Sequence, residues 1–371
     1  MHLYLHIPFC RQACHYCDFH FSTNTSRKEE MVNAICREIA AQKDYLKGAE
    51  LKTIYFGGGT PSLLNVAEFE LIFDTIRSYH AIANDAEITL EANPEDLTPI
   101  YCEMIASKGI NRLSIGIQSF QEKNLVLMNR NHQASDSTRA IQNAQKAGIA
   151  NISIDLIYGI PDNSEADLTQ DLEKATSLGV QHISAYSLTV EPKTVFGVQK
   201  KKGTFQEIPD STMASAFMQV REYVESKGYE GYETSNFAKN SHYSIHNTSY
   251  WLQEPYLGIG PSAHSFNGHS RQWNVANNAK YITSGLALAE KEELSLADQY
   301  NEYLMVRLRT KWGIQLVYVR ETLAQLGLDY PEKEFQDWVN KGYAQVTGEN
   351  LILVGTGKLL ADRLSSDIFV V

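Results

Sequence analysis

The amino-acid sequence predicts an α/β fold of parallel strands alternating with helices, followed by a small, mainly helical C-terminal domain. Six short β-type runs alternate with longer amphipathic patterns from residue 3 to residue 228. Hydrophobic residues make up 43% of the 371 residues and charged residues 21%, which is typical of a globular protein. After residue 228 the alternation stops, so a full barrel of eight strand–helix units is not supported.

The predicted strands span residues 3–9, 51–57, 87–93, 112–118, 151–159 and 182–190. Helical patterns lie between and after them at residues 26–42, 66–80, 135–148, 165–179 and 211–228, and several end in glycine. Repeated strand–helix units give parallel strands joined by right-handed crossovers, hence either an α/β barrel or an open doubly wound sheet. In both arrangements ligands bind at the carboxyl ends of the strands.

Beyond Gly228 the sequence turns into an aromatic and polar stretch that we interpret as loop, and a further helical segment covers residues 298–310. We therefore expect three parts. Residues 1–230 form the strand–helix domain, residues 231–290 form a segment that packs on it, and residues 291–371 form the C-terminal domain.

Charge and cysteine content exclude several classes of protein. Lys and Arg number 33 against 44 Asp and Glu, a formal net charge of −11, and no basic run could follow a phosphate backbone. Nucleic acid is therefore not an expected partner. Residues 1–9 lack a secretory signal pattern, and no apolar stretch approaches the roughly 18 residues of a membrane span. We expect a cytoplasmic protein, whose five cysteines serve metal or redox chemistry instead of disulfides.

Three cysteines, Cys10, Cys14 and Cys17, form a C-x3-C-x2-C pattern in the loop after the first predicted strand. A structural zinc site needs four protein ligands, so this interpretation requires one more. The histidines close enough in sequence to supply it are His6, His15 and His20.

A four-iron cluster is the alternative, because three thiolates on such a cluster leave one iron open to an external ligand. The remaining two cysteines do not offer a fourth thiolate. Cys36 and Cys102 lie inside helical patterns among apolar neighbours, where a free cysteine is more often a small buried hydrophobic residue.

At these residues the chain resembles the radical S-adenosylmethionine (SAM) superfamily, whose signature is C-x3-C-x2-C after the first strand of a partial (β/α)6 barrel. The resemblance implies a 4Fe-4S cluster on Cys10, Cys14 and Cys17, with the open iron chelated by the methionine moiety of SAM. The phrase YLHIPFCRQACHYCDF, residues 4–19, is similar to the branch that contains the anaerobic coproporphyrinogen III oxidases and related heme chaperones. The similarity covers essentially the whole chain.

Polar residues also stand at the ends of successive predicted strands. Glu91, Gln118 and Asp155 lie amid or beside apolar residues, where an unpartnered carboxylate or amide is costly. Each alone could be a satisfied structural group, whereas three at successive strand ends favour a shared ligand. The glycine run of YFGGGTPS, residues 55–62, lets backbone approach a ligand closely, although a tight turn explains it equally well.

The resemblance assigns roles to these positions. It implies that Gly58, Gly59 and Thr60 contact the amino group of the methionine moiety, that Glu91, Gln118, Arg130 and Asp155 bind the ribose and carboxylate of SAM, and that Tyr4 and Tyr16 flank the cluster and the adenine. Arg130 suits a carboxylate because its guanidinium can pair bidentately.

Two departures favour the heme chaperones within this branch. The oxidases carry a further cysteine two residues after the third motif cysteine and a long N-terminal extension, whereas this sequence has Phe19 at that position and its first motif cysteine at residue 10. The segment HNTSYW, His246–Trp251, matches an H-N-x-x-Y-W pattern similar to that of the heme chaperones.

Heme binding is expected at this segment. A neutral imidazole such as that of His246 is a common axial ligand of heme iron, and Tyr250 and Trp251 offer aromatic faces to a porphyrin. A hydrogen-bonded loop histidine is the alternative interpretation of His246. The other histidines nearby in sequence are His242, His264 and His269.

The sequence thus predicts a heme chaperone that binds heme and a SAM-liganded 4Fe-4S cluster and passes heme to apo-hemoproteins, with peripheral contact to membrane hemoproteins left open. The alternative is an oxygen-independent coproporphyrinogen III oxidase, in which SAM cleavage yields a radical that acts on propionate side chains. A radical enzyme for an unrelated small molecule is a second rival. Whether SAM is cleaved is open, so we assign no catalytic residue.

Overall fold

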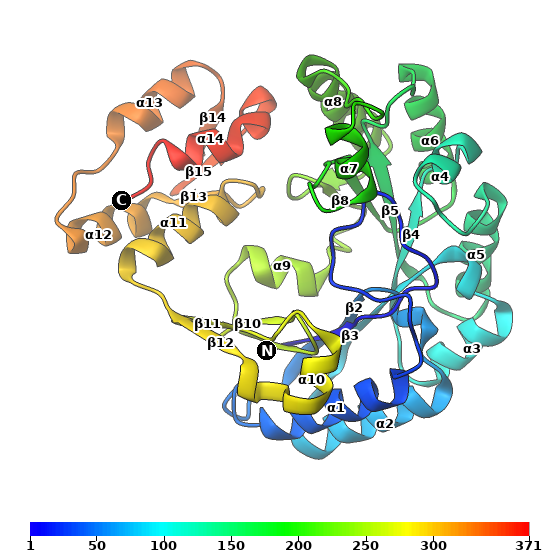
Figure 1. Cartoon of the computed structure of the whole chain (residues 1–371). Coiled ribbons are helices and arrows are strands. Elements are labelled where there is room, and N and C mark those ends of the chain that lie inside the picture. The colour runs from blue at the N-terminus through cyan, green and yellow to red at the C-terminus, as the bar shows by residue number, and fades with distance from the viewer. Residues whose placement is uncertain (371) are drawn as a thin grey trace.

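The computed structural model describes residues 1–370 of the chain. Its main body is a curved sheet with helices on its outer side, and the C-terminal elements lie together beside the open side of that sheet (Figure 1). The strand order is β12-β11-β10-β9-β1-β2-β3-β4-β5-β6-β8-β7. Strands β1 to β6 pair in parallel with their neighbours in sequence order, which gives the six strand–helix units of a partial barrel.

The strands of the large sheet are β1 (His2–Ile7), β2 (Leu51–Gly58), β3 (Ile82–Ala92), β4 (Arg112–Gln118), β5 (Asn151–Tyr158), β6 (His182–Ser187), β7 (Glu230–Gly231), β8 (Asn236–Ala238), β9 (Tyr256–Ile259), β10 (His264–Phe266), β11 (Ser270–Trp273) and β12 (Glu290–Glu293). A second sheet, of order β13-β15-β14, contains β13 (Ile314–Gln315), β14 (Ala344–Thr347) and β15 (Asn350–Leu353).

The helices of the barrel region are α1 (Lys28–Ala41), α2 (Val66–Tyr79), α3 (Pro99–Ser107), α4 (Glu122–Leu127), α5 (Ala134–Lys146), α6 (Glu165–Ser177), α7 (Val195–Lys201), α8 (Asp210–Ser226), α9 (Ile245–Trp251) and α10 (Asn278–Ser284). Those nearer the C-terminus are α11 (Leu296–Arg307), α12 (Leu316–Leu326), α13 (Glu332–Asn340) and α14 (Ala361–Ser366). Short 3-10 helices are η1 (Pro61–Leu63), η2 (Pro94–Asp96), η3 (Gly285–Leu288) and η4 (Gly355–Leu360).

Alternation along the strands gives the barrel an apolar outside and a polar inside. In β1, Leu3 and Leu5 belong to the core cluster that packs under the outer helices. The side chains at the alternate positions point the other way, because His2 contacts the hydroxyl of Thr53 on β2, and Tyr4 contacts a ring on β2 and a ring on α9. A polar interior is what a ligand-binding barrel requires, and it makes the inside of this sheet the place to look for a site.

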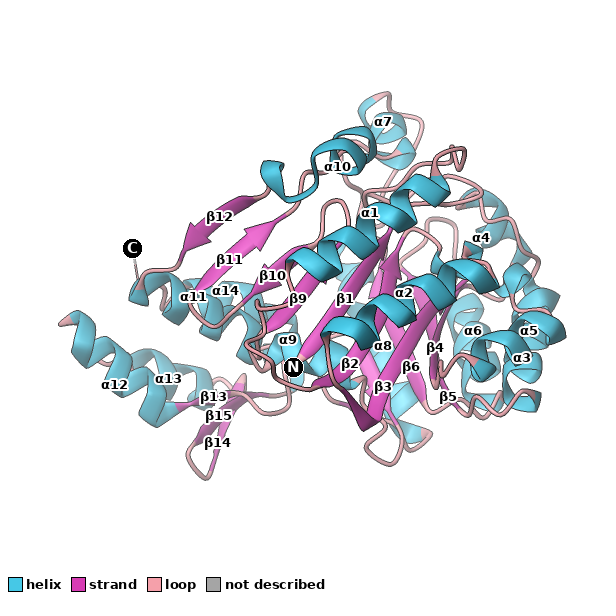
Figure 2. Cartoon of the chain, turned by 90° about the horizontal axis from the view of Figure 1, so that it is seen from below, coloured by secondary structure: helices cyan, strands magenta, loops and turns pink. Residues whose placement is uncertain are grey.

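All six predicted strands and the predicted helices of the repeated units are present, which confirms the α/β barrel interpretation. Residues 229–251, which we interpreted as loop, instead contain β7, β8 and α9. The rest of the segment up to residue 290 contains β9, β10, β11 and α10, and Figure 2 shows β9, β10 and β11 side by side next to β1. These strands have two to four residues, too few for their alternation to be visible in the sequence.

The C-terminal elements have a core of their own. Tyr300, Leu304, Leu323, Phe335 and Leu351 are buried together and join α11, α12, α13 and the three-stranded sheet. The predicted helix at 298–310 corresponds to α11, whose start is fixed by a capping box between Ser295 and Asp298. Among the helices of residues 1–370, none is long and apolar enough to cross a membrane.

Candidate functional site

The motif cysteines lie in the loop that leaves the carboxyl end of β1. Cys10, Cys14 and Cys17 are free thiols of intermediate exposure. The amide of Cys10 donates to the carbonyl of Ser22 (3.0 Å), which closes the loop, and the amide of His15 donates to that of Met128 (3.1 Å), which anchors its middle. Burial raises the pKa of Cys10 to about 12, and a hydrogen bond from Thr60 partly counters it.

This loop offers three thiols, one fewer than the four protein ligands of a structural zinc site and the number that leaves one iron of a four-iron cluster open to an external ligand. Within residues 1–370, no three His, Cys, Asp or Glu side chains converge on one point. The nearby histidines are engaged elsewhere: His6 Nε2 lies 2.8 Å from the carbonyl of His20, His15 Nδ1 lies 2.9 Å from that of Leu127, and His20 Nε2 lies 2.7 Å from Asn278 Oδ1.

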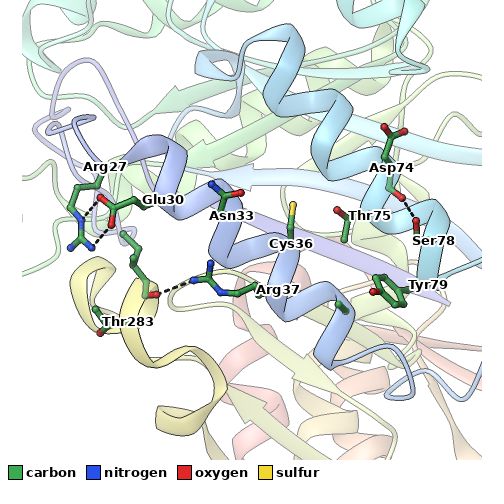
Figure 3. Close-up of a pocket in the computed structure, with 12 residues that line it drawn as sticks. Arg27, Glu30, Asn33, Cys36, Arg37, Asp74, Thr75, Ser78, Tyr79 and Thr283 are labelled. Carbon is green, nitrogen blue, oxygen red and sulfur yellow. Dashed lines mark hydrogen bonds and ion pairs between the residues drawn. The ribbon is translucent and has the colours of Figure 1, made fainter.

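The other two cysteines lie away from this loop. Cys36 is on α1 in an outer groove of about 800 Å³, and Figure 3 shows it between Arg37 of the same helix and Thr75 of α2. Cys102 is buried in α3 within the main core. Neither shares a structural element with the motif loop. The expectation of a buried side chain is confirmed for Cys102 and is wrong for Cys36, which is half-buried and lines the groove.

The glycine run brings β2 against the cysteine loop. Gly58 has φ +107°, and a Cβ there would lie 2.6 Å from the ring of His6. The amides of Gly58, Gly59 and Thr60 donate to Glu91 Oε2, to the carbonyl of Ile7 and to that of Phe9. These three amides already have partners within the protein. The amino group of the methionine moiety is a hydrogen-bond donor, so backbone carbonyl oxygens of this segment would be its partners.

The polar residues at the strand ends do come together. Arg130 is the centre of the group, since it donates to Cys14 Sγ (3.4 Å), to Asn93 Oδ1 (2.7 Å) and to the carbonyl of Gly116 (2.7 Å). Gln118 ends β4 with φ +71°, and a Cβ on Gly116 would lie 2.9 Å from Gln118 Nε2 and 3.5 Å from Arg130 Nη2. The guanidinium therefore links the cysteine loop to the ends of β3 and β4.

Two carboxylates lie deeper in the barrel. Glu91 accepts hydrogen bonds from the hydroxyl of Tyr55 (2.8 Å) and the amide of Gly58 (3.2 Å). Asp155 accepts from the hydroxyl of Ser114 (3.2 Å), and burial raises its pKa. Each carboxylate thus has a hydrogen-bond partner but is shielded from water. This is the environment expected of carboxylates that bind a ligand carrying hydrogen-bond donors.

Sequence reasoning missed two residues of this interior. Asn93 accepts from Arg130, and Arg112 is fully buried with its Nε 3.8 Å from Glu87 and with Nε and Nη1 otherwise unpartnered. The alternation of β3 carried a signal for Asn93, because it follows Glu91 by two residues and so shares its face. Arg112 opens β4, and nothing in its local sequence distinguishes it from a surface arginine.

The two tyrosines predicted to flank the cofactors lie at different depths. Tyr16 is in the cysteine loop, packs against the apolar cluster of Met128 and Phe196, and has its pKa raised by burial. Tyr4 is in the barrel interior, stacked on Tyr55 with ring centroids 6.0 Å apart and its hydroxyl 3.1 Å from His6 Nδ1.

The H-N-x-x-Y-W segment forms α9, a short helix inside the open side of the barrel. His246 is 1% exposed and stacks on Tyr55 at 4.8 Å. Its Nδ1 lies 2.6 Å from Thr53 Oγ1 and its Nε2 lies 2.8 Å from the hydroxyl of Tyr250. Both ring nitrogens are therefore occupied, and the ring would have to give up one of these bonds before it could bind iron.

Beside α9 lies a cleft of about 1000 Å³ between the barrel and the C-terminal elements. Its aromatic and apolar lining includes Tyr158, Tyr186, Phe217, Tyr250, Trp251, Val306, Leu359 and Leu360, and its charged lining includes Asp210, Glu233, Arg309, Lys358 and Asp362. Figure 1 shows α9 between the strands of the barrel and the helices α11 and α14.

Phe19, where the oxidases have a cysteine, is 74% exposed.

The desolvated Glu91 makes stability depend on pH. Burial raises its pKa to about 7 from an ordinary 4.5, a hydrogen bond from Tyr55 lowers it, and the charge of Asp155 raises it. Between these values the folded state holds more protons than the unfolded state, so the free energy of unfolding should fall as pH rises from about 4.5 to 7. Urea unfolding of the cluster-free protein measures this slope, which should be smaller in Glu91→Gln. Equal slopes in the two proteins would contradict the assignment.

Comparison with known proteins shows which superfamily model and which solved structure the chain matches. The family model described as the radical SAM superfamily matches residues 4–175. The solved structure of coproporphyrinogen III oxidase (HemN) from Escherichia coli, described as a radical SAM enzyme, superposes with a TM-score of 0.83 over 98% of this chain and 89% of that chain at 20% identity, which shows the fold alone. Residues 4–175 thus form a radical SAM domain.

Curated relatives show to which family the whole chain belongs. The heme chaperone HemW of Bacillus subtilis (strain 168) is 33% identical over 97% of both chains. That of Escherichia coli (strain K12) is 32% identical over 98% of this chain and 96% of its own, and that of Synechocystis is 38% identical over 86% and 81%. The chain belongs to the HemW family.

Proposed function

We propose that this protein is a heme chaperone that binds heme together with a SAM-liganded 4Fe-4S cluster and passes heme to apo-hemoproteins. The observation that carries the proposal is the placement of the H-N-x-x-Y-W segment, because α9 forms a wall of the 1000 Å³ cleft. The full-length relatives named heme chaperones support it. The acceptors would be apo-hemoproteins, a class that leaves room for peripheral contact with membrane hemoproteins.

For the cluster and SAM, the proposed ligands are those brought together at the carboxyl ends of the strands. Cys10, Cys14 and Cys17 would hold the cluster, and Arg130, which already donates to Cys14 Sγ, would pair with the carboxylate of SAM beside it. Glu91, Gln118 and Asp155 would receive the polar groups of SAM, and Tyr4 and Tyr16 would border the site. When bound, the cluster and SAM supply electron-transfer and radical chemistry.

For heme, the proposed site is the cleft. A porphyrin is flat and apolar with carboxylates at one edge, and the cleft offers aromatic walls together with two cations, Arg309 and Lys358. Trp251 and Tyr250 would contact the ring. In this arrangement residues 1–230 would bind the cluster, residues 231–290 would carry the heme motif, and residues 291–370 would form the other wall of the cleft.

Hemin titration of the anaerobically purified full chain tests the proposal. We expect a Soret shift that saturates near one heme per chain, and no conversion of coproporphyrinogen III even with an intact cluster, reductant and SAM, because Phe19 stands where the oxidases have a thiol. Porphyrinogen consumption without stoichiometric heme binding would instead establish the oxidase.

Trp251→Ala should weaken heme binding by about 1 to 3 kcal/mol, or about 5- to 150-fold, through lost aromatic contact. The matched control is Trp273→Ala, because Trp273 lies on β11, stacks on His264 and does not line the cleft. Fluorescence quenching by hemin measures both affinities. An equal loss in the two variants would place the heme elsewhere.

A further inference from the structure

We propose that Tyr250, and not His246, supplies the protein ligand to heme iron, and that a hydrogen-bonded chain behind it accepts the phenol proton. This inference rests on the proposed function, since it requires that the protein binds heme. It assigns different roles to two residues of the H-N-x-x-Y-W segment. Tyr250 binds the iron, and His246 positions Tyr250 and accepts its proton.

The chain of hydrogen bonds runs through the barrel in four links. The hydroxyl of Tyr250 lies 2.8 Å from His246 Nε2, and His246 Nδ1 lies 2.6 Å from Thr53 Oγ1. Thr53 Oγ1 lies 3.0 Å from His2 Nδ1, and His2 Nε2 lies 2.9 Å from Glu254 Oε2. His2, Thr53 and His246 are buried, whereas the side chain of Glu254 is 43% exposed. The links therefore connect the cleft wall with solvent.

One direction of donation satisfies every link when Glu254 is ionised, because a carboxylate can only accept. His2 then donates from Nε2 to Glu254, and Thr53 donates to His2 Nδ1. His246 donates from Nδ1 to Thr53, which leaves His246 Nε2 as the acceptor of the Tyr250 hydroxyl. Both rings must be neutral for this order, and burial lowers the pKa of His2 and of His246.

Iron ligation suits the tyrosine better than the histidine. Tyr250 lines the cleft and is partly exposed, whereas His246 is buried and has both nitrogens occupied. Tyrosinate is an established heme ligand. A phenolate at this half-buried position is costly without a compensating charge, and ferric iron would supply that charge.

The proposed step conserves atoms and charge. The O–H bond of Tyr250 breaks as the phenolate oxygen binds ferric iron, and its proton passes to His246 Nε2. The Nδ1 proton of His246 moves to Thr53, the hydroxyl proton of Thr53 moves to His2 Nδ1, and the Nε2 proton of His2 moves to Glu254. The protonated carboxyl then releases its proton to water, and no electron is transferred.

The test uses the full chain loaded with ferric heme and needs no variant for its first arm. Protein containing ¹⁵N-labelled histidine should show no ¹⁵N hyperfine coupling to the ferric iron by electron paramagnetic resonance, whereas its resonance Raman spectrum should contain tyrosinate modes. Histidine coupling would overturn the inference while leaving heme binding intact. Failure of the wild-type chain to bind heme would overturn the proposed function, and this inference with it.

Variants provide the second arm. Tyr250→Phe should abolish the tyrosinate modes and weaken heme binding at least tenfold. Tyr186→Phe is the matched control, because Tyr186 lines the same cleft and its ring is exposed. Loss of the tyrosinate modes in Tyr186→Phe, with their retention in Tyr250→Phe, would move the ligand to Tyr186 and overturn the assignment.

Thr53→Val tests the proton path separately from the ligand. Valine matches threonine in shape but has no hydroxyl, so the link between His246 and His2 is broken while Tyr250 remains. We expect the same final spectrum, formed at least tenfold more slowly, and a normal rate in Thr53→Ser. If Thr53→Val forms the tyrosinate complex at the wild-type rate, the path is not used.

Discussion

Replacing Cys14 by serine (Cys14→Ser) is expected to remove the broad iron–sulfur absorbance of the anaerobically reconstituted protein completely. Cys14 would supply one of only three protein ligands, and a serine hydroxyl is a poor substitute for a thiolate. Its Sγ also accepts a hydrogen bond from Arg130 (3.4 Å), so the change removes the partner of a cation as well. Cys10→Ser and Cys17→Ser should behave alike, because all three thiols lie in one loop.

Cys36→Ser provides the matched control for these changes. Cys36 is a thiol of the same chain and of similar exposure, but it lies on α1 in the outer groove of Figure 3. Iron and sulfide should therefore stay at the wild-type content in this variant. Retention of the cluster in Cys14→Ser together with its loss in Cys36→Ser would refute the assignment.

Arg130→Met should produce the second large effect, a loss of SAM affinity by about 10- to 150-fold. This estimate takes about 1.5 to 3 kcal/mol for the charge-assisted pairing of a guanidinium with a carboxylate. The guanidinium is held in place by Asn93 Oδ1 and the carbonyl of Gly116, both at 2.7 Å, so it does not need to be ordered when the ligand arrives.

The SAM-induced change in the electron paramagnetic resonance signal of the reduced cluster measures this affinity. Arg130→Lys keeps the charge but not the bidentate fork, and should fall between wild type and Arg130→Met. Cluster content must be equal in all three proteins for the comparison to hold. If Arg130→Met responds to SAM at wild-type concentrations, the guanidinium does not bind the cofactor.

Most of the barrel could be predicted from the sequence because its elements are encoded locally. Each of the six strands is a run of six or more residues, and helices such as α2 and α6 have capping boxes beginning at Asn65 and Ser164. The stretch from 231 to 290 could not be predicted in this way. Strands β9 to β11 have three or four residues each, and they form only because β1 offers a neighbouring edge.

The residues of the candidate site also differ in how well the sequence predicts them. The cysteine loop is recognisable because its three thiols lie within eight residues. Glu91 and Gln118 are recognisable because each stands near the end of an apolar run, and Asp155 because it interrupts the apolar run of β5. Glycine was the ambiguous case. Gly58 reads equally as a ligand contact or as a turn, and the structure shows that the ring of His6 leaves no room for a Cβ there.

The sequence by itself determined the order of strands and helices and the loop chemistry, since both depend on residues close together in the chain. Only the tertiary structure decided what surrounds His246. Its partner Thr53 lies 193 residues away, and Glu254 lies 252 residues from His2, so no local pattern could reveal the chain of hydrogen bonds. The cleft likewise exists only because α9 and the C-terminal elements pack across the open side of the barrel, bringing Trp251 and Lys358 to one cavity.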